Sequence, residues 1–305
     1  MNLIERFELH YVDSRENTLI NYKSDIKHYF KYASERKFIS ECDDIAIVEA
    51  TNWEIASQYR AEMVKNGLSP RTINRKLSAL RTFFDMCIYL DDVNIKQNPF
   101  KDVRSVKAKR SVSTQKEFLD DEEIGKLLTA IETEEKGTRN FEYNSKRDLL
   151  LYSLIITTGL RISEALNLTF GDINEDELLL YVRDGKGGKD RIIPIDDYII
   201  ELLKDYMTVR NSVNTDYYNL IFLSKNGNIL DTRASNVNLK KYCERAGIKV
   251  VSNHELRHTF ATRAIANGMN LVDLQELMGH ESLKTTGLYT HANFNGSIKV
   301  VSIKR

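Results

Sequence analysis

Two arginines, two histidines, a lysine and a tyrosine in the second half of the chain are side chains that could act together on a phosphodiester. In chain order they are Arg161, Lys186, His254, Arg257, His280 and Tyr289. A phosphodiester gains negative charge as its pentavalent transition state forms, so a catalyst needs fixed cations aimed at the non-bridging oxygens. Arginine suits this role because its planar fork donates two hydrogen bonds to phosphate and keeps its proton. The set predicts attack on phosphorus by a protein hydroxyl group.

The tyrosine and the lysine have distinct roles in this hypothesis. A tyrosine hydroxyl has a pKa near 10, so forming phenolate at pH 7 costs roughly 4 kcal/mol unless bases or cations help. His254, His280 and the arginines could give that help to Tyr289. Lys186 lies in a Gly-Lys-Gly-Gly-Lys turn, whose small residues permit close approach to a groove. It could protonate a leaving 5′-oxygen, and Lys189 is a rival for the same role.

One motif has a second interpretation, because it also matches the His-Glu-x-x-His pattern of zinc metalloproteases. His254 and His258 would lie one helical turn apart and could share a metal, with Glu255 as the base and Glu276 or Glu281 as a third ligand. Spacing does not exclude this alternative. It leaves Arg161, Lys186, His280 and Tyr289 without a role, so zinc proteolysis is the second hypothesis.

Bulk properties describe an ordinary globular protein. The chain has 305 residues, which favours two domains, and is 42% hydrophobic and 29% charged. The longest strongly apolar stretch, 149–156, is too short to span a bilayer, and no signal pattern is recognisable at the N-terminus. A cytoplasmic location is expected. Cys42, Cys87 and Cys243 form no Cys-x-x-Cys pair, so neither disulfides nor a thiolate metal site is expected.

The distribution of basic residues matters more than the net charge, which is zero. Six Lys or Arg and one acidic residue occur from Lys101 to Lys116, and four bases without an acid occur from Arg71 to Arg81. A solvated charged surface is the alternative explanation for either cluster. The predicted DNA contacts are Arg71, Arg75, Lys76, Arg81, Lys107, Lys109 and Arg110.

The first hundred residues have the periodicity of amphipathic helices. Apolar residues at steps of three and four from Leu19 to Ala33 predict one helix, with Ser14 as a possible cap. Thr51 and Glu54 predict a capping box at the start of the next.

A further helix is predicted to begin at Ser69 and Pro70, a cap followed by a first-turn proline. Arg71, Arg75 and Lys76 stand largely off its apolar stripe, at a helix start where backbone N–H groups also favour phosphate. This helix is predicted to lie on DNA. The stripe consists of Ile73, Leu77, Leu80, Phe84, Cys87 and Ile88.

Periodicity is lost from about residue 98 to 117, which predicts an extended basic connector. The elements predicted after it are helices at 120–131 and 146–157, β-type runs at 178–183 and 191–195 around a glycine-rich turn, a further strand pair near 221–227, and helices from 232 to 289. The predicted fold class is mainly α with a small antiparallel β-sheet. Its predicted parts are a helical DNA-binding domain at 1–100, a linker at 101–117 and a catalytic domain at 118–305.

Taken together, the motifs resemble those of the tyrosine recombinase (phage integrase-like) family, with the Xer-type site-specific recombinases closest in layout. The resemblance implies that Arg161, Lys186, His254, Arg257 and His280 are the activating residues. It further implies that Tyr289 is the nucleophile and that Glu164 orients an active-site neighbour. The segments that carry the resemblance are 158–166, the Gly-Lys-Gly turn, 254–262, 277–280, 289–291 and, for an N-terminal core-binding domain, 72–81.

The reaction implied by the resemblance uses no metal, cofactor or ATP. Tyr289 would attack a phosphate of double-stranded DNA, form a 3′-phosphotyrosyl bond and release a 5′-hydroxyl, and a partner strand's 5′-hydroxyl would then reseal the strand. Four protomers on two sites would exchange strands through a Holliday junction. A second recombinase or a regulatory partner protein, and the choice between chromosome partition, plasmid resolution and mobile-element integration, stay open. DNA binding with an inactive site is disfavoured, because no catalytic position is substituted.

Some features are particular to this chain. Gly287 is a poor helix former close to the proposed nucleophile, and Arg263 stands where the family often has a histidine. The tail at 297–304 has a β-compatible pattern, which predicts docking on a neighbouring protomer as an added strand or a short helix. A disordered or self-packed end is an equally good interpretation.

Overall fold

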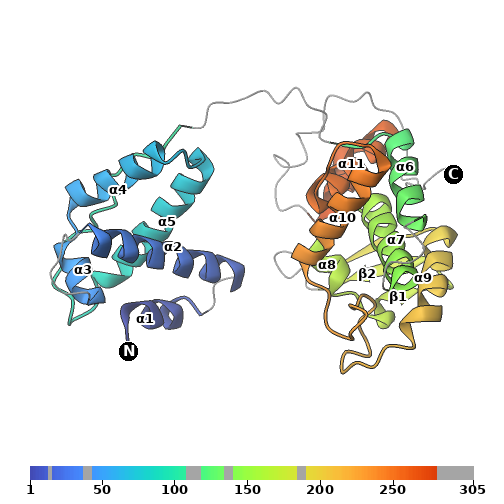
Figure 1. Cartoon of the computed structure of the whole chain (residues 1–305), viewed down its shortest axis with the longest axis horizontal. Coiled ribbons are helices and arrows are strands. Elements are labelled where there is room, and N and C mark those ends of the chain that lie inside the picture. Colours follow the sequence, from blue (N-terminus) through green and yellow to red (C-terminus); the bar gives the residue numbers. More distant parts are fainter. Residues whose placement is uncertain (13–15, 37–42, 108–117, 134–139, 184–189, 280–305) are drawn as a thin grey trace. The chain divides into compact units, whose positions relative to one another are not determined.

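The protein folds as two compact units, residues 1–112 and 113–305 (Figure 1). The first unit is helical, and the second combines helices with a small antiparallel sheet, so the predicted fold class is confirmed. In the part of the chain that is described, no helix is both long and apolar enough to cross a membrane. The computed structural model describes residues 1–12, 16–36, 43–107, 118–133, 140–183 and 190–279.

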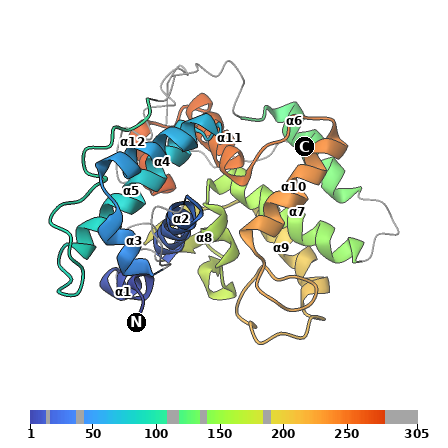
Figure 2. The same ribbon diagram turned by 60° about the vertical axis from the view of Figure 1, so that its left-hand side comes forward.

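The first unit is built around α2, which packs against α1, α3 and α5, and Figure 2 shows these helices beside it. Tyr29 on α2 is fully buried and meets the rings of Tyr59 and Phe100 edge-on at centroid distances of 5.1 and 5.2 Å. Each buried ring of this kind stabilises the fold by about 1.5–3 kcal/mol through loss of apolar surface to water. The helices are α1 (Leu3–His10), α2 (Glu16–Glu35), α3 (Asp44–Ala50), α4 (Trp53–Lys65) and α5 (Pro70–Cys87).

The helix starts in this unit follow their capping residues. The predicted start of α5 is confirmed, since the Ser69 hydroxyl accepts the Thr72 N–H at 3.1 Å with Pro70 in the first turn. The predicted cap of α4 is wrong by one residue: Asn52 accepts the N–H of Ile55. Thr51 instead turns inward, where its hydroxyl lies 2.8 Å from that of Tyr29. Neither α1 nor α3 was predicted from the sequence, and Ser14 lies outside the described residues.

The segment from residue 98 to 107 belongs to the first unit, although the sequence predicts an extended connector there. Phe100 and Val103 are buried in its core. The Arg81 guanidinium donates to the carbonyls of both residues, at 3.1 and 2.6 Å, and the Asn74 side chain pairs with both backbone polar groups of Val106. Hydrogen bonding from α5 therefore fixes a stretch that lacks any periodicity of its own.

The second unit surrounds α7, which runs between α11 and α9 (Figure 1). Almost every side chain of α7 from Arg147 onward is buried, and the helix ends at Gly159, whose φ of +66° is left-handed. The helices are α6 (Asp121–Glu132), α7 (Phe141–Thr158), α8 (Ile162–Leu166), η1 (Phe170–Asp172), α9 (Asp197–Arg210), α10 (Thr232–Ala246), α11 (Asn253–Ala266) and α12 (Leu271–Met278).

The sheet of this unit has the order β1-β2-β3 with both pairs antiparallel. The predicted hairpin is confirmed, with Val182 opposite Arg191 next to the connection between the strands and Leu179 opposite Pro194 at the open end. The strands are β1 (Ile173–Asn174), β2 (Leu179–Val182) and β3 (Arg191–Pro194). The predicted strand pair near 221–227 is reduced to an isolated bridge between Leu223 and Ile229. Four elements, α8, η1, β1 and α9, were not predicted from the sequence.

Candidate active site

The position of Arg161 is set by the left-handed residue that ends α7. At Gly159, a Cβ atom would lie 2.3 Å from the Phe260 ring, so only glycine fits both the backbone conformation and the space. The chain then turns, and Arg161 becomes the cap of α8. Its backbone N–H donates to the Glu164 carboxylate at 2.8 Å. Arg161 is therefore held by its backbone at the junction of two helices.

Glu164 is the centre of what we call the arginine cluster, formed by Arg161, Glu164, Arg191 and Arg257. Its carboxylate accepts from Arg161 Nη1 at 2.6 Å and from both terminal nitrogens of Arg191 at 3.2 and 2.7 Å. Arg257 Nη1 lies 3.9 Å from the same carboxylate. Because one carboxylate faces three guanidinium groups, the cluster has a formal charge of 3 − 1 = +2.

The protonation of Glu164 follows from this environment. Burial alone raises the pKa of the carboxyl group, but the hydrogen bonds and charge of Arg191, supported by Arg161, outweigh that effect and lower the pKa below its ordinary value. The carboxylate is thus ionised at neutral pH, and it holds two of the arginine side chains in fixed directions. Exposure differs within the cluster: the side chain of Arg161 is 25% exposed and that of Arg257 only 3%.

The same arginines hold the C-terminal end of α12. Arg191 Nε donates to the carbonyl of Leu277 at 2.7 Å, Arg257 Nη2 to that of Met278 at 2.6 Å, and Arg161 Nη2 to that of Gly279 at 2.9 Å. These are among the last carbonyls of a helix, which have no partner within the helix itself. Residues far apart in the sequence are thereby joined at one point.

Helix α11 presents Arg257 inward and His254 to solvent. Ser252 caps the helix, and Glu255 accepts the Ser252 N–H and hydroxyl at 2.8 and 2.9 Å. His254 and His258 lie with their Nε2 atoms 3.0 Å apart. Within the described residues, no group of three or more His, Cys, Asp or Glu could hold a metal ion, and Glu255 is engaged in capping. The zinc alternative finds no support in this geometry.

Three of the predicted catalytic residues, Lys186, His280 and Tyr289, lie outside the described residues, as does the tail at 297–304. The structure therefore brings together Arg161, Glu164 and Arg257 and shows His254 one turn before Arg257 on α11.

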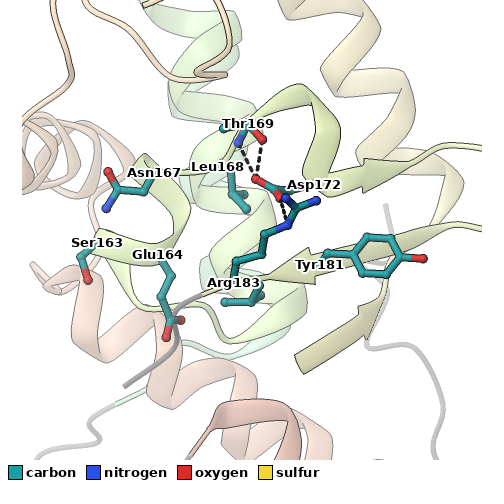
Figure 3. A pocket seen from close by; sticks show the side chains of 9 residues that line it. Ser163, Glu164, Asn167, Leu168, Thr169, Asp172, Tyr181 and Arg183 are labelled. Atoms are coloured by element: carbon teal, nitrogen blue, oxygen red, sulfur yellow. Dashed lines mark hydrogen bonds and ion pairs between the residues drawn. The ribbon is translucent and has the colours of Figure 1, made fainter. Parts of the chain in front are cut away.

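A groove lined by both polar and apolar side chains lies beside α8, between that helix, η1 and β2 (Figure 3). Asp172 accepts from the backbone and the hydroxyl of Thr169 at 2.9 and 2.6 Å, and Arg183 Nε lies 3.0 Å from its other oxygen. Ser163 and Asn167 line the wall that α8 contributes. The Asp172–Arg183 pair links the residue after β2 to η1.

The predicted DNA contacts differ in how they are placed. Arg71 and Lys107 are exposed, and Lys109 and Arg110 lie outside the described residues. Arg81 donates to two carbonyls of its own unit.

The expectation that Lys76 stands off the apolar stripe of α5 is wrong. It is a buried residue whose ammonium group lies 3.1 Å from the Asp25 carboxylate. Arg75 pairs with the same carboxylate, and its side chain remains 41% exposed. The helical spacing of Lys76 and its long apolar stem both permit this, since a lysine at the edge of a stripe can reach an internal acid.

Sequence reasoning missed Arg191. Its signal was present in the strand pattern: Arg191 and Ile193 are buried, whereas Ile192 between them is 53% exposed. In a strand, side chains alternate between faces, so an arginine in register with a buried isoleucine predicts an internal ionic partner.

Comparison with known proteins places this geometry in a family. Residues 117–296 match the Phage integrase family, and residues 4–88 match the Phage integrase N-terminal SAM-like domain. Tyrosine recombinase XerC of Thermodesulfovibrio yellowstonii is 32% identical over 98% of this chain and 93% of its own length. Tyrosine recombinase XerA of Thermococcus kodakarensis is 35% identical over 78% of this chain and 77% of its own.

Solved structures agree in fold. The Tn1549 transposon integrase in complex with circular intermediate DNA has a TM-score of 0.69 at 22% identity, covering 96% of this chain and 95% of that one. The XerH site-specific recombinase bound to difH substrate, a pre-cleavage complex, has a TM-score of 0.68 at 24% identity, covering 95% and 80%. The chain belongs to the phage integrase family, whose curated relatives here are named tyrosine recombinases. It is thus an enzyme of DNA strand breakage and rejoining.

Proposed function

We propose that this chain is a site-specific recombinase in which Tyr289 is the nucleophile and the arginine cluster binds the scissile phosphate. The observation that carries the proposal is the convergence of Arg161 and Arg257, from separate helices, on the single carboxylate of Glu164. A net charge of +2 at one point matches a phosphodiester that gains negative charge in its transition state. Family membership supplies the class of reaction.

The proposed chemical step exchanges one phosphate ester for another. The Tyr289 hydroxyl loses its proton to a histidine, His254 or His280, and its oxygen bonds to phosphorus. The bond to the 5′-oxygen breaks, and Lys186 gives that oxygen a proton. The energy of the broken bond is kept in the 3′-phosphotyrosyl linkage, so a 5′-hydroxyl of the partner strand reverses the step without ATP.

The two arginines meet the phosphate differently in this proposal. Arg161 is a quarter exposed and can donate to it directly. Arg257 is 3% exposed and gives both terminal nitrogens to carbonyls. A phosphate that binds Arg257 therefore has to compete with at least one of two carbonyl groups, those of Gly159 and Met278.

DNA binding by the first unit is proposed for Arg71 and Arg75 on α5, for Lys107, and for Lys109 and Arg110. The side chains of the first three are exposed. Lys76 and Arg81 are omitted from this direct role because their charged groups bond within the unit, to Asp25 and to two carbonyls. They stabilise the surface that presents the others.

The oligomeric state proposed for strand exchange is a tetramer on two DNA sites, with the tail at 297–304 docking between protomers. Deleting residues 297–305 should impair assembly or coordinated cleavage, which native electrophoresis of the DNA complex would reveal. Unchanged recombination would reject the role of the tail and leave the cleavage proposal intact.

The test of the proposed function begins by selecting bound genomic fragments, because the target sequence is needed first. The selected site is then prepared with a nick beside the cleavage position and incubated with the protein in EDTA. A covalent protein–DNA adduct that is lost in Tyr289→Phe is expected. Tyr218→Phe is the matched control, since Tyr218 is 67% exposed and has no role in the proposed site.

Each other outcome is informative. An adduct that persists in Tyr289→Phe assigns the nucleophile to another residue. Binding without any adduct, on a selected site, supports a DNA-binding protein with an inactive site. Peptide cleavage that EDTA abolishes would instead favour the zinc alternative through His254 and His258.

A further inference from the structure

Three consecutive carbonyls at the end of α12 are bonded by three arginines that come from three different elements. Leu277 is bonded by Arg191 at the start of β3, and the next two carbonyls by Arg257 of α11 and by Arg161 at the cap of α8. The last turn of α12 contains no basic residue of its own. The negative end of its dipole is therefore balanced entirely by side chains from outside the helix, as far as the described residues go.

Arg191 differs from the other two arginines in where its nitrogens go. Its two terminal nitrogens face the two oxygens of Glu164 in a fork, and its Nε donates to the Leu277 carbonyl. Its side chain is 6% exposed, against 25% for Arg161. The planar fork thus links Glu164 to α12 and is turned away from solvent, so its geometry suits positioning better than contact with DNA.

The packing at this point is tight. A Cβ atom on Gly279 would lie 3.2 Å from Arg191 Nη1 and 3.7 Å from Arg161 Nη1. The φ of Gly279 is +60°, which permits the chain to turn just after the three carbonyls. Helix α12 also packs against β3, the strand that carries Arg191. A displacement of Arg191 would therefore disturb its hydrogen bonds both with Glu164 and with the end of α12.

We propose that Arg191 is a positioning residue that locks the end of α12 to Glu164 and so aligns Arg161 and Arg257 for the phosphate. The inference rests on the proposed function, because it explains how the two phosphate-binding arginines are held in the directions that cleavage requires. In this scheme Glu164 and Arg191 act as one unit: the carboxylate orients the arginines, and Arg191 transmits that orientation to the helix that ends at Gly279.

The test compares Arg191→Met and Arg191→Lys with the wild-type full-length chain on the selected, nicked DNA. Single-turnover adduct formation at saturating protein should fall about 100-fold in Arg191→Met, the cost expected for a reacting group misplaced by about 1 Å. The dissociation constant for DNA should stay unchanged, since Arg191 does not reach the surface. Lysine keeps the charge but not the fork, so Arg191→Lys should resemble the methionine variant.

Hydrogen exchange of the free protein gives a readout that needs no DNA. The amides of α12 should exchange faster in both Arg191 variants, while those of α9 should not. Arg210→Met is the matched control, because Arg210 is also a buried arginine that donates to backbone carbonyls, those of Leu220 and Ile221 among them. Its adduct formation per folded molecule should equal that of the wild type.

The outcomes separate this inference from the proposed function. A wild-type rate in a folded Arg191→Met variant overturns the inference, as would an equal loss in Arg210→Met. Absence of an adduct in the wild type on selected DNA overturns the proposed function instead, and hydrogen exchange still decides whether Arg191 holds α12. If Arg191→Met does not fold, Arg191→Lys bears the test on both readouts.

Discussion

Each unit of the chain buries one acidic side chain opposite several basic ones, and the two arrangements differ in what the bases do next. In the first unit, Asp25 is 2% exposed and takes Arg75 on one oxygen and Lys76 on the other. In the second, Glu164 is 9% exposed and faces Arg161, Arg191 and Arg257. Each of the three arginines around Glu164 also donates to a backbone carbonyl at the end of α12.

The net charge around Asp25 is smaller than that around Glu164, and this difference distinguishes a structural ion pair from a candidate phosphate-binding site. Asp25 faces two cations, a balance of 2 − 1 = +1, and the more exposed of them, Arg75, extends that charge to the surface of α5. Glu164 faces three, and the resulting +2 is concentrated in a partly buried place where an anion would meet little competition from water. The larger positive excess, in a place partly shielded from water, is what distinguishes the arrangement around Glu164 and suits it to bind phosphate.

The largest effect expected from this comparison concerns Glu164→Gln. Loss of the carboxylate leaves buried guanidinium groups without their counter-charge, so the free energy of unfolding should fall by about 3 kcal/mol. Adduct formation per folded molecule should fall about 100-fold because the arginines lose their alignment. Urea unfolding and single-turnover cleavage measure the two effects.

Asp25→Asn is the control for that experiment. It should destabilise the first unit through the same loss of a buried counter-charge, but at saturating protein it should leave the rate of adduct formation per folded molecule unchanged. An equal loss of cleavage in both variants would remove the distinction between the two acidic residues.

Sequence reasoning identified the residues of the arginine cluster that lie in recognisable motifs, but it missed the contacts between elements around both acidic residues. In the motif at 158–164, the role of Glu164 is implied only by the family resemblance, whereas the glycine turn after a buried helix indicates Arg161. Arg257 follows from its motif on α11 in the same way. Local spacing thus determines residues that share one element or one turn.

The partners of Asp25 and the role of Arg191 depend on contacts between elements, which local spacing does not determine. Lys76 pairs with a residue of α2, and Arg191 reaches Leu277 of α12. The failure at residues 98–107 has the same origin, since that segment has no periodicity and is held by Arg81 and Asn74. The hairpin and the buried α7 were predicted because their apolar patterns are strong enough alone.

The second effect is the pH dependence of stability. Because the pKa of Glu164 is lowered in the folded protein, its contribution is fully present above the ordinary carboxyl pKa of about 4.3 and is lost as pH falls through the folded value. The stability difference between wild type and Glu164→Gln should be constant near neutral pH and shrink in acid. Urea titrations at several pH values measure it.

Asp196 supplies a control with the opposite sign. Burial raises its pKa, so its ionised form is penalised in the folded protein. Its contribution is therefore present below the unfolded pKa and is lost as pH rises through the folded one. Asparagine can keep the cap on Ile199, so Asp196→Asn isolates the charge. The same slope in both variants would contradict the assignment at Glu164.

The third effect is the salt dependence of DNA binding, which should differ between variants of exposed and of buried basic residues in the first unit. The logarithm of the DNA affinity falls linearly with the logarithm of the salt concentration. Arg71→Ala should make this negative slope shallower by about 0.9, the value for one phosphate contact on B-DNA. Lys76→Met should leave that slope unchanged, because its ammonium group is committed to Asp25. Lys31→Ala, which removes an exposed charge from α2 outside the predicted contacts, controls for net charge. A change in this salt dependence in Lys76→Met would show that Lys76 contacts DNA, as the sequence predicted.

The smallest effect compares two helix ends within the second unit. Gly247 and Gly279 both end helices with left-handed φ, +64° and +60°, so an alanine at either position should cost about 1 kcal/mol of stability. At Gly247 a Cβ atom meets nothing within 4 Å, whereas at Gly279 it lies 3.2 Å from Arg191 Nη1. Gly279→Ala should therefore slow adduct formation and Gly247→Ala should not, although thermal unfolding should place the two variants at similar stability. Equal rates of adduct formation in the two variants would show that cleavage tolerates a displacement of the end of α12. Glu164 alone would then align the arginine cluster.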